Sequence, residues 1–313
     1  MKFVVMGSGG VGGFFGGKLA RGGQEVWFVA RGEHLKAMQA AGLRIESSEG
    51  NYTIPPGRIT GRTEDAGPAD VILICVKSYD TESATRQLIP IVKHDTIVIS
   101  LQNGVDNEEK MKKILPTGIV YGGVALIYAT ITTPGVVTET GGPKKLTFGP
   151  LSHPAGMDDE RGKTVLNSMI GAGINAEYTL DIHSALWKKF IFITAVAGLT
   201  TITRLTLGEI LSVSETRRLL VDAMREVELI AKAKGARIEP GFMDMIFQTL
   251  RNFENNTHSS LYYDLMHQKP MEIEALSGIV VRYGAELDIP TPINKTIYAA
   301  LLPYHLKHSA TGA

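Results

Sequence analysis

Apolar runs typical of buried strands alternate, along the first half of the chain, with segments whose apolar residues recur every three or four positions. The runs cover residues 2–6, 25–29, 69–76, 96–101 and 118–128. Helical spacing follows the first run through Val11, Phe15 and Leu19, and it returns at residues 81–92 and 107–115. Strands that alternate with helices predict a mainly parallel sheet covered by helices.

Two shorter apolar segments later in this half, residues 136–140 and 145–148, flank Gly141-Gly142-Pro143. Glycine and proline between two alternating runs are typical of a tight connection. We therefore expect a hairpin that turns at residues 141–143 and is added to the sheet with antiparallel edges.

The pattern changes at about Asp181, after which helical spacing dominates. The helical segments cover residues 185–199, 214–235, 272–287 and 291–302. In the second of them, Ser214 is the expected N-cap and Gly235 the terminating residue. The prediction is an α/β Rossmann-type dinucleotide-binding domain, residues 1–179, followed by an all-α helical domain, residues 180–313. The active site is expected in the cleft between the two domains.

Composition narrows the function classes. The chain has 313 residues, 44% of them hydrophobic, and its 32 Lys and Arg residues balance 32 Asp and Glu residues. This length and this apolar content suffice for two ordinary domains with sizeable cores. A net charge of zero gives no reason to expect a general affinity for nucleic acid or anionic membranes. A small-molecule substrate is the better expectation.

Cysteine usage and the lengths of the apolar runs bear on the compartment. Cys75 is the single cysteine and lies in the apolar run from Val71 to Val76. We expect a buried, inert thiol without a disulfide partner in this chain, and no metal site is predicted. The sequence starts without a pattern typical of a signal peptide, and no apolar run approaches about 18 residues, the length of a membrane span. These features predict a cytoplasmic protein.

The first apolar run leads directly into Gly7-Ser8-Gly9-Gly10-Val11-Gly12, a GxGxxG sequence. Gly7 permits a tight turn, Gly9 lets the backbone approach a pyrophosphate, and Gly12 lets the next helix pack closely on the strand. Alone this motif is a weak signal in a chain with 34 glycines, and a flexible turn is the alternative. The strand before it, the helix after it and the strand at residues 25–29 complete a βαβ unit. We therefore predict a dinucleotide site at residues 7–12.

The end of the second strand indicates which dinucleotide binds. NAD sites usually carry Asp or Glu there for the ribose 2′-hydroxyl, whereas NADP sites offer an Arg to the 2′-phosphate. Here the strand ends without an acid and Arg31 follows it. A guanidinium makes charge-assisted, often bidentate bonds to phosphate. We predict NADP(H) over NAD(H), and a solvated loop cation is the alternative for Arg31.

Further polar motifs follow later strands and open the helical half. Lys77-Ser78 and Gln102-Asn103-Gly104 each follow a buried strand, where ligands bind in α/β sheets. The helical half contributes Trp187-Lys188-Lys189-Phe190, Ser259-Ser260 and Lys269-Pro270-Met271-Glu272. With the GxGxxG turn and Arg31, the order and spacing of these motifs resemble the ketopantoate reductase (2-dehydropantoate 2-reductase) family over nearly the full length of the chain. Such enzymes use NADPH to reduce a 2-keto acid, ketopantoate, to its hydroxy acid on the route to pantothenate.

The resemblance implies a role for each motif residue. Lys189 becomes the general acid, and Glu272 a partner for the substrate hydroxyl and the cofactor. Asn103 contacts substrate and nicotinamide, Ser260 binds substrate, and Lys77 lies beside the cofactor. Chemistry supports the choice of a lysine, because hydride arrival at a carbonyl carbon leaves an alkoxide that an ammonium both stabilises and protonates. The resemblance also leaves a homodimer open.

Each of these residues has a purely structural alternative. Lys188 stands next to Lys189, and most lysines lie on solvated helix faces. Glu272 could be a first-turn acid that complements a helix dipole, with Glu274 as an equally charged neighbour. The remaining alternatives are an N-cap for Ser260, a turn for Asn103-Gly104, and a side chain that extends from the strand end into water for Lys77.

One departure from the family pattern bears on the substrate. Better-known members carry asparagines four and eight residues after the lysine, whereas this chain has Ile193 and Ala197. The loss of amide donors weakens discrimination for a polar substrate. Ketopantoate is the first candidate. The alternatives are a related NADP-dependent 2-hydroxyacid dehydrogenase that acts on a more apolar keto acid, and an NADPH-sensing protein without catalysis.

Overall fold

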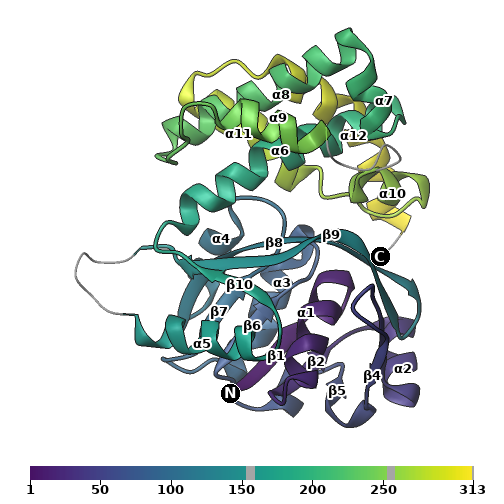
Figure 1. Ribbon diagram of the computed structural model, residues 1–313, viewed down its shortest axis with the longest axis vertical. Helices are drawn as coiled ribbons and strands as arrows, with labels where there is room; N and C mark the ends of the chain where they lie inside the picture. The colour runs from purple at the N-terminus through teal and green to yellow at the C-terminus, as the bar shows by residue number, and fades with distance from the viewer. Residues whose placement is uncertain (153–158, 252–257, 312–313) are drawn as a thin grey trace. The chain divides into compact units, whose positions relative to one another are not determined.

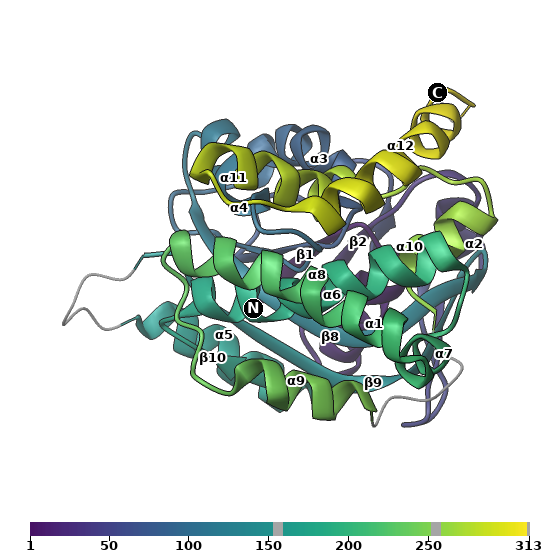
Figure 2. The ribbon, with the colours of Figure 1, turned by 90° about the horizontal axis from the view of Figure 1, so that it is seen from above.

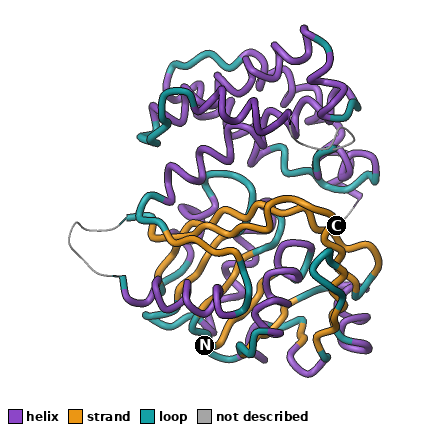
Figure 3. The backbone as a smooth tube through the Cα atoms, in the orientation of Figure 1, coloured by secondary structure: helices purple, strands orange, loops and turns teal. Residues whose placement is uncertain are grey.

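The computed structural model describes residues 1–152, 159–251 and 258–311 (Figure 1). The chain divides into two compact units, the first made of residues 1–102 and 106–183 and the second of residues 103–105 and 184–313. Strands lie in the first unit, and the described part of the second consists of helices and loops (Figure 3). The predicted fold class, a Rossmann-type domain followed by a helical domain, is confirmed.

Within the described residues, the first unit holds one sheet of ten strands. Nine of them follow the order β4-β3-β9-β8-β7-β6-β1-β2-β5, and β10 pairs with β9. Pairing is parallel from β8 to β5, and antiparallel between β8 and β9 and between β3 and β4. The strands are β1 (Lys2–Met6), β2 (Glu25–Val29), β3 (Leu43–Glu46), β4 (Tyr52–Ile54), β5 (Ile59–Thr60), β6 (Val71–Ile74), β7 (Ile97–Ser100), β8 (Ile119–Thr133), β9 (Val136–Pro150) and β10 (Asn175–Tyr178).

Alternation along the buried strands builds two cores, one on each face of the sheet. In β1, Phe3 and Val5 enter one core while Val4 and Met6 enter the other, because successive side chains of a strand point to opposite faces. The first core also takes apolar residues from α1 (Gly10–Arg21), α2 (Gly32–Ala41) and α5 (Glu160–Gly171). The second takes them from α3 (Thr81–Leu88) and α4 (Asn107–Ile114). Such a doubly covered parallel sheet is what near-continuous apolar strands predict.

The hairpin expected at residues 141–143 is wrong. Residues 136–140 and 145–148 lie in one strand, β9, which pairs with β8 through a turn at Pro134-Gly135. Gly141 and Gly142 have φ values of 139° and 84°, and the β8–β9 register shifts opposite them. These glycines therefore form an irregularity within the ladder, as glycines inside strands often do. The expected antiparallel pairing does occur, between β8 and β9.

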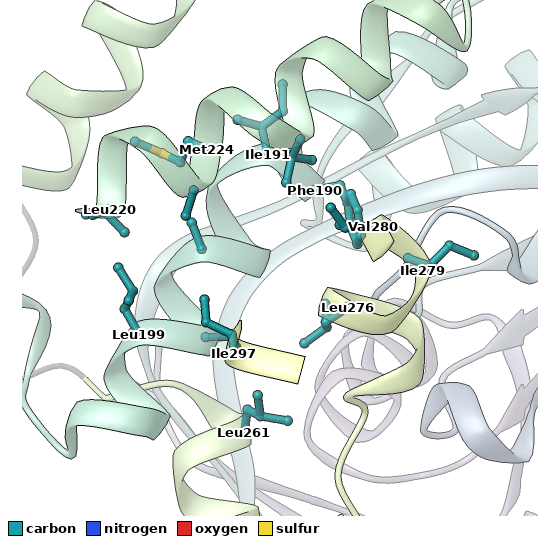
Figure 4. Packing of buried hydrophobic residues seen from close by; sticks show 14 of the residues in the cluster. Phe190, Ile191, Leu199, Leu220, Met224, Leu261, Leu276, Ile279, Val280 and Ile297 are labelled. Atoms are coloured by element: carbon teal, nitrogen blue, oxygen red, sulfur yellow. The ribbon is translucent and has the colours of Figure 1, made fainter. Parts of the chain in front are cut away.

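The second unit consists, in the described chain, of seven α-helices and one short π-helical segment around one apolar core. Figure 4 shows residues of this core from α6, α8, α10, α11 and α12, including Phe190, Met224, Leu261 and Ile297. Viewed from above, α8 can be followed beside α7, α11 and α12, which it contacts (Figure 2). The helices are α6 (Ile182–Thr203), α7 (Leu207–Ser212), α8 (Ser214–Ala233), α9 (Phe242–Arg251), α10 (Ser260–Met266), α11 (Ile279–Leu287) and α12 (Pro292–Thr311).

Helix ends in this unit show one error of the sequence reading. Val213, not Ser214, is the N-cap of α8, and the Ser214 hydroxyl donates to Glu215 instead. Gly235 does follow the helix end as predicted, with a φ of 86° that L side chains rarely adopt. The N-terminus of α12 is capped from another helix, because the buried Glu226 carboxylate accepts from the backbone N–H groups of Ile293 and Asn294.

By length and composition alone, helix α6 is long and apolar enough to cross a membrane, although Lys188 and Lys189 interrupt its apolar residues. It is the one such helix in the described chain, and 61% of its apolar window is buried inside the protein. Phe190, Ile191 and Leu199 of this helix lie in the core of the second unit. These features are typical of a core helix in a soluble protein.

Candidate active site

The GxGxxG residues form a tight turn between β1 and α1. Gly7 has a φ of 98°, and a Cβ there would lie 2.8 Å from the backbone nitrogen of Val76. A Cβ at Gly12 would lie 2.2 Å from the carbonyl oxygen of Gly7, so strand and helix approach too closely for any side chain at either glycine. At Gly9 a Cβ would meet no atom of the described residues within 4 Å. The turn is thus packed on its protein side and open at Gly9.

The N-terminus of α1 fits a pyrophosphate. Its N-cap, Gly9, supplies no side-chain cap, and the first turn of this described helix contains no acidic residue. The first N–H groups of a helix have no partner inside the helix, and the helix dipole favours an anion beside them. The residues present therefore suit the phosphates of a dinucleotide.

His34, which the sequence analysis did not single out, fixes the Ser8 peptide of this turn. The backbone N–H of Gly135 donates to His34 Nδ1 at 3.0 Å, and His34 Nε2 lies 2.9 Å from the carbonyl oxygen of Ser8. Because Nδ1 accepts, Nε2 carries the proton and donates to Ser8. Burial lowers the pKa of His34, which favours this neutral form. The ring of His34 therefore links the GxGxxG turn to the β8–β9 turn at Pro134-Gly135.

Arg31 and Lys77 lie where strands β2 and β6 end. Arg31 follows β2 as the N-cap of α2, and its Nη2 forms an ion pair of 2.6 Å with Asp80 Oδ2. Lys77 precedes the 3₁₀ turn Ser78–Asp80, three residues beyond β6. The carboxyl ends of parallel strands meet at one edge of a sheet, so both cations belong to the edge where the GxGxxG turn begins. Asp80 was missed because it lies 49 residues from Arg31 in the sequence.

Gln102 anchors the chain where it leaves the first unit. Its side-chain amide donates to the carbonyl oxygen of Val76 at 3.1 Å and to the hydroxyl of Thr81 at 2.8 Å, while its oxygen accepts from Ser100 at 3.3 Å. The residue is 5% exposed. Asn103, Gly104 and Val105 then belong to the second unit, and Asp106 returns to the first. Gly104 has a φ of 108°, a backbone conformation that favours glycine.

Lys189, Asn103 and Glu272 meet in the second unit. Lys189 Nζ donates to Asn103 Oδ1 at 3.0 Å, and Asn103 Nδ2 lies 3.4 Å from Glu272 Oε2. Lys189 is half-buried and Glu272 is 5% exposed. A lysine ammonium can only donate hydrogen bonds and a carboxylate can only accept them, so the two neighbours fix the orientation of the amide. The Asn103 amide thus connects a cation to an anion.

Lys188 and Glu274, the charged sequence neighbours of Lys189 and Glu272, have other partners. Lys188 forms an ion pair of 2.7 Å with Glu239. Glu274 forms an ion pair of 2.7 Å with Arg282 and accepts a hydrogen bond of 2.6 Å from the Tyr298 hydroxyl. The backbone near Glu272 also differs from the regular helix expected at residues 272–287, because residues 274–278 form a π-helical segment and α11 begins at residue 279. Such π segments are frequent at functional sites.

The two serines have different roles in the fold. Ser259 is the N-cap of α10, accepts from the Tyr262 N–H at 3.2 Å and accepts from the Thr200 hydroxyl at 2.9 Å. Ser260 is the exposed first residue of that helix. The alternative that Ser260 is an N-cap is therefore wrong, because Ser259 has that role. Ile193 is half-buried and Ala197 is buried, one and two turns after Lys189 on the same face of α6.

Two further features are the cysteine thiol and the groups that could hold a metal ion. Cys75 keeps some exposed surface, but burial of its thiol raises the pKa, which leaves a protonated sulfur of low reactivity. No cluster of three or more His, Cys, Asp or Glu residues that could hold a metal ion occurs among the described residues.

Comparison with known proteins identifies the family. The model described as "Ketopantoate reductase PanE/ApbA" matches residues 3–153, and that described as "Ketopantoate reductase PanE/ApbA C terminal" matches residues 181–305. The chain belongs to the ketopantoate reductase family. It is therefore an oxidoreductase with a nicotinamide dinucleotide as cofactor, and the resemblance seen in the motifs is confirmed.

Members of the ketopantoate reductase family match over nearly the whole chain. The 2-dehydropantoate 2-reductase of Pyrococcus horikoshii is 31% identical over 301 residues, which cover 96% of each chain. A crystal structure of a PanE/ApbA family ketopantoate reductase from Ralstonia eutropha JMP134 is 31% identical, with a TM-score of 0.88 over 99% of this chain and 100% of that one. D-mandelate dehydrogenase, solved with NADH and anilino(oxo)acetate, has a TM-score of 0.88 over 100% of both chains at 22% identity, and it shares the fold alone.

Proposed function

We propose that this member of the family uses NADPH to reduce a 2-keto acid to a 2-hydroxy acid, with 2-dehydropantoate as the first substrate and pantoate as the product. The observation that carries the proposal is the Lys189–Asn103–Glu272 arrangement, with bonds of 3.0 Å and 3.4 Å. The proposal also includes that the enzyme is cytoplasmic and that it forms a homodimer. Light scattering after size-exclusion chromatography tests the dimer.

Lys189 is the proposed general acid. When bound, the cofactor supplies the hydride that reaches the carbonyl carbon. Negative charge then develops on the carbonyl oxygen, and a nearby ammonium stabilises it and transfers a proton from Nζ to that oxygen. An ammonium carries three N–H donors, and the bond to Asn103 uses one of them. The neutral amine left behind regains its proton from solvent.

Asn103 and Glu272 are proposed to hold Lys189 and the substrate in place. The Asn103 amide connects the ammonium to the buried Glu272 carboxylate, so the lysine is oriented by a neutral group and charge-balanced by a nearby acid. Glu272 is also proposed to accept a hydrogen bond from the substrate hydroxyl and to contact the cofactor. Ser260 is the proposed further substrate ligand, and its exposure at the start of α10 leaves its side chain accessible.

Cofactor binding is proposed to use the first unit. Residues 7–12 and the N-terminus of α1 would hold the pyrophosphate, and Arg31 the 2′-phosphate of NADPH. Lys77 would lie beside the cofactor at the same edge of the sheet. The open side of the turn at Gly9 and the uncapped N-terminus of α1 support this part of the proposal.

A more apolar keto acid is the second candidate substrate. Ile193 and Ala197 share a face of α6 with Lys189, so the residues that follow the proposed acid on this face are apolar where amide donors would suit a polar substrate. A pocket that lacks such donors gains little from a substrate hydroxyl.

One panel experiment decides between these candidates. Oxidation of NADPH is followed with ketopantoate and with 2-keto acids whose side chains increase in apolar size, and the hydroxy acid product is identified. We expect turnover with the panel and the highest kcat/KM for ketopantoate. A higher kcat/KM for an apolar keto acid would favour the second candidate. NADPH binding without turnover of any keto acid would refute the reductase and favour a sensor.

A further inference from the structure

The Arg31–Asp80 ion pair joins two segments that follow the strands on either side of β1, the strand that leads into the GxGxxG turn. Strand β1 leads into that turn and lies between β6 and β2, parallel to both. Asp80 comes from the turn after β6, and Arg31 lies two residues beyond the end of β2. The two side chains therefore approach each other across the carboxyl end of β1, where α/β sheets bind the adenosine part of a dinucleotide.

Asp80 directs its carboxylate at Arg31 instead of using it in its own helix. It is the N-cap residue of α3, a position at which Asp normally accepts from the helix's first N–H groups, but its side chain makes no such bond. Its Oδ2 lies 2.6 Å from Arg31 Nη2 instead. The side chain of Asp80 is 22% exposed and that of Arg31 is 81% exposed, so the carboxylate is the more enclosed partner and the guanidinium is accessible to a ligand.

A carboxylate at this place has opposite consequences for the two cofactors. A dianionic 2′-phosphate bound by Arg31 would share the guanidinium with Asp80, and like charges at one site repel. A free ribose 2′-hydroxyl would instead find the acceptor that NAD sites usually carry at the end of the second strand. The chain lacks an acid at that strand end, and Asp80 supplies one from a neighbouring strand.

We propose that Asp80 is a specificity-determining residue that lowers the preference of this protein for NADPH over NADH. The inference rests on the proposed function, because it takes Arg31 as the ligand of the 2′-phosphate. In this proposal the preference for NADPH over NADH is reduced, because Arg31 attracts the 2′-phosphate and Asp80 repels it.

Isothermal titration calorimetry of the full-length protein with NADPH and with NADH tests the proposal without turnover. Asp80→Asn removes the charge and keeps an oxygen that can accept from Arg31, and Asp80→Ala removes both. We expect each variant to bind NADPH about tenfold more tightly and NADH no more tightly than the unsubstituted protein does. The ratio of the two dissociation constants should therefore shift toward NADPH by about tenfold or more.

Glu82→Gln is the matched control. Glu82 also belongs to α3 and forms an exposed ion pair of 3.1 Å with Arg86, four residues later. Its substitution should leave both dissociation constants unchanged. Arg31→Ala should weaken NADPH binding and spare NADH, which tests the cofactor assignment separately.

Two results for the Asp80 variants, and two for the cofactor assignment on which they depend, would overturn the inference. A weaker NADPH complex in Asp80→Ala would mean that the carboxylate orients Arg31 for the phosphate. An unchanged ratio in both Asp80 variants would mean that it plays no part in discrimination. If Arg31→Ala spares NADPH binding, the 2′-phosphate assignment falls first, and the inference falls with it. If neither nucleotide binds the unsubstituted protein, the proposed function fails as well.

Discussion

Asn103 suits its position because its amide presents an acceptor to one neighbour and a donor to the other. Its Oδ1 accepts from Lys189, and its Nδ2 points to Glu272. An aspartate would place a second carboxylate against Glu272, and an aliphatic residue would leave both charges without their connection. The amide therefore bridges a cation and an anion in a largely buried site.

The two glutamates near the π-helical segment give a matched test of this arrangement. Glu272→Gln keeps the shape of the side chain and removes its charge, so the amide of Asn103 loses a charged acceptor and Lys189 its compensating anion. We expect kcat/KM for the keto acid to fall about 10²-fold while the fold is retained.

Glu274→Gln is the control, since Glu274 pairs with Arg282 and not with Asn103. Its substitution should change kcat/KM by no more than about threefold, because exposed ion pairs contribute little. Equal losses in both variants, measured by steady-state kinetics, would remove Glu272 from the proposed site.

Sequence reasoning reached the individual residues of this site but not all of their partners. Asn103 and Glu272 are 169 residues apart and Arg31 and Asp80 are 49 apart, so no local pattern connects them. Asn103, Lys189 and Glu272 were found through the order of the family's motifs. Asp80 and His34 carry no such motif, and their roles depend on which strands and turns become neighbours.

At the scale of elements, the segment from β7 to α4 holds an unusual buried carboxyl group. Glu108 in the first turn of α4 is 3% exposed. Burial, and then the nearby charges of Asp106 and Glu109, raise the pKa of Glu108 to about 7, against an opposing hydrogen bond from Ser100. Ser100 also donates to Gln102, so the acid adjoins the residue that anchors the Asn103 segment.

This raised pKa predicts a pH-dependent stability. A carboxyl with a pKa of 4.5 in the unfolded chain and about 7 in the folded one binds its proton more tightly when folded. Its stabilising contribution is complete below pH 4.5 and is lost as the pH rises through about 7. Glu108→Gln is always neutral, so we expect its thermal midpoint to exceed that of the unsubstituted protein by about 4 °C at pH 8, with little difference at pH 5.

The exposed neighbour Glu109 provides the comparison for this measurement. Glu109→Gln should show a much smaller pH-dependent difference in thermal midpoint. A Glu108→Gln protein that gains nothing at pH 8 relative to pH 5 would contradict the assignment of a buried, protonated carboxyl.

Elements with strong periodicity were predictable, and the turn between two of them was not. The runs that became β1, β2, β6 and β7 are largely apolar because both faces of the sheet are covered. The glycines at positions 141 and 142 resembled a turn, but Pro134-Gly135 makes it and β9 continues through them. Glycine marks both turns and bulges, and only strand register distinguishes the two.

At the scale of the whole molecule, the proposed chemistry divides between two units whose apolar cores are separate. The turn at residues 7–12, with Arg31 and Lys77, belongs to the first unit, and Lys189 and Glu272 belong to the second. Asn103 belongs to the second unit by its contacts, although the chain reaches it directly from the first. Cofactor binding and proton transfer should therefore be separable by substitution.

Comparison of Lys189→Ala with Lys188→Ala tests this account most directly. Steady-state NADPH oxidation with the best keto acid is measured for both, and the NADPH dissociation constant is measured in parallel by calorimetry. The account predicts that Lys189→Ala binds NADPH nearly as the unsubstituted protein does while turnover falls about 10² to 10⁴-fold. Lys188→Ala, which loses an ion pair with Glu239, should keep its turnover. Undiminished turnover in Lys189→Ala would contradict the central claim that this lysine delivers the proton.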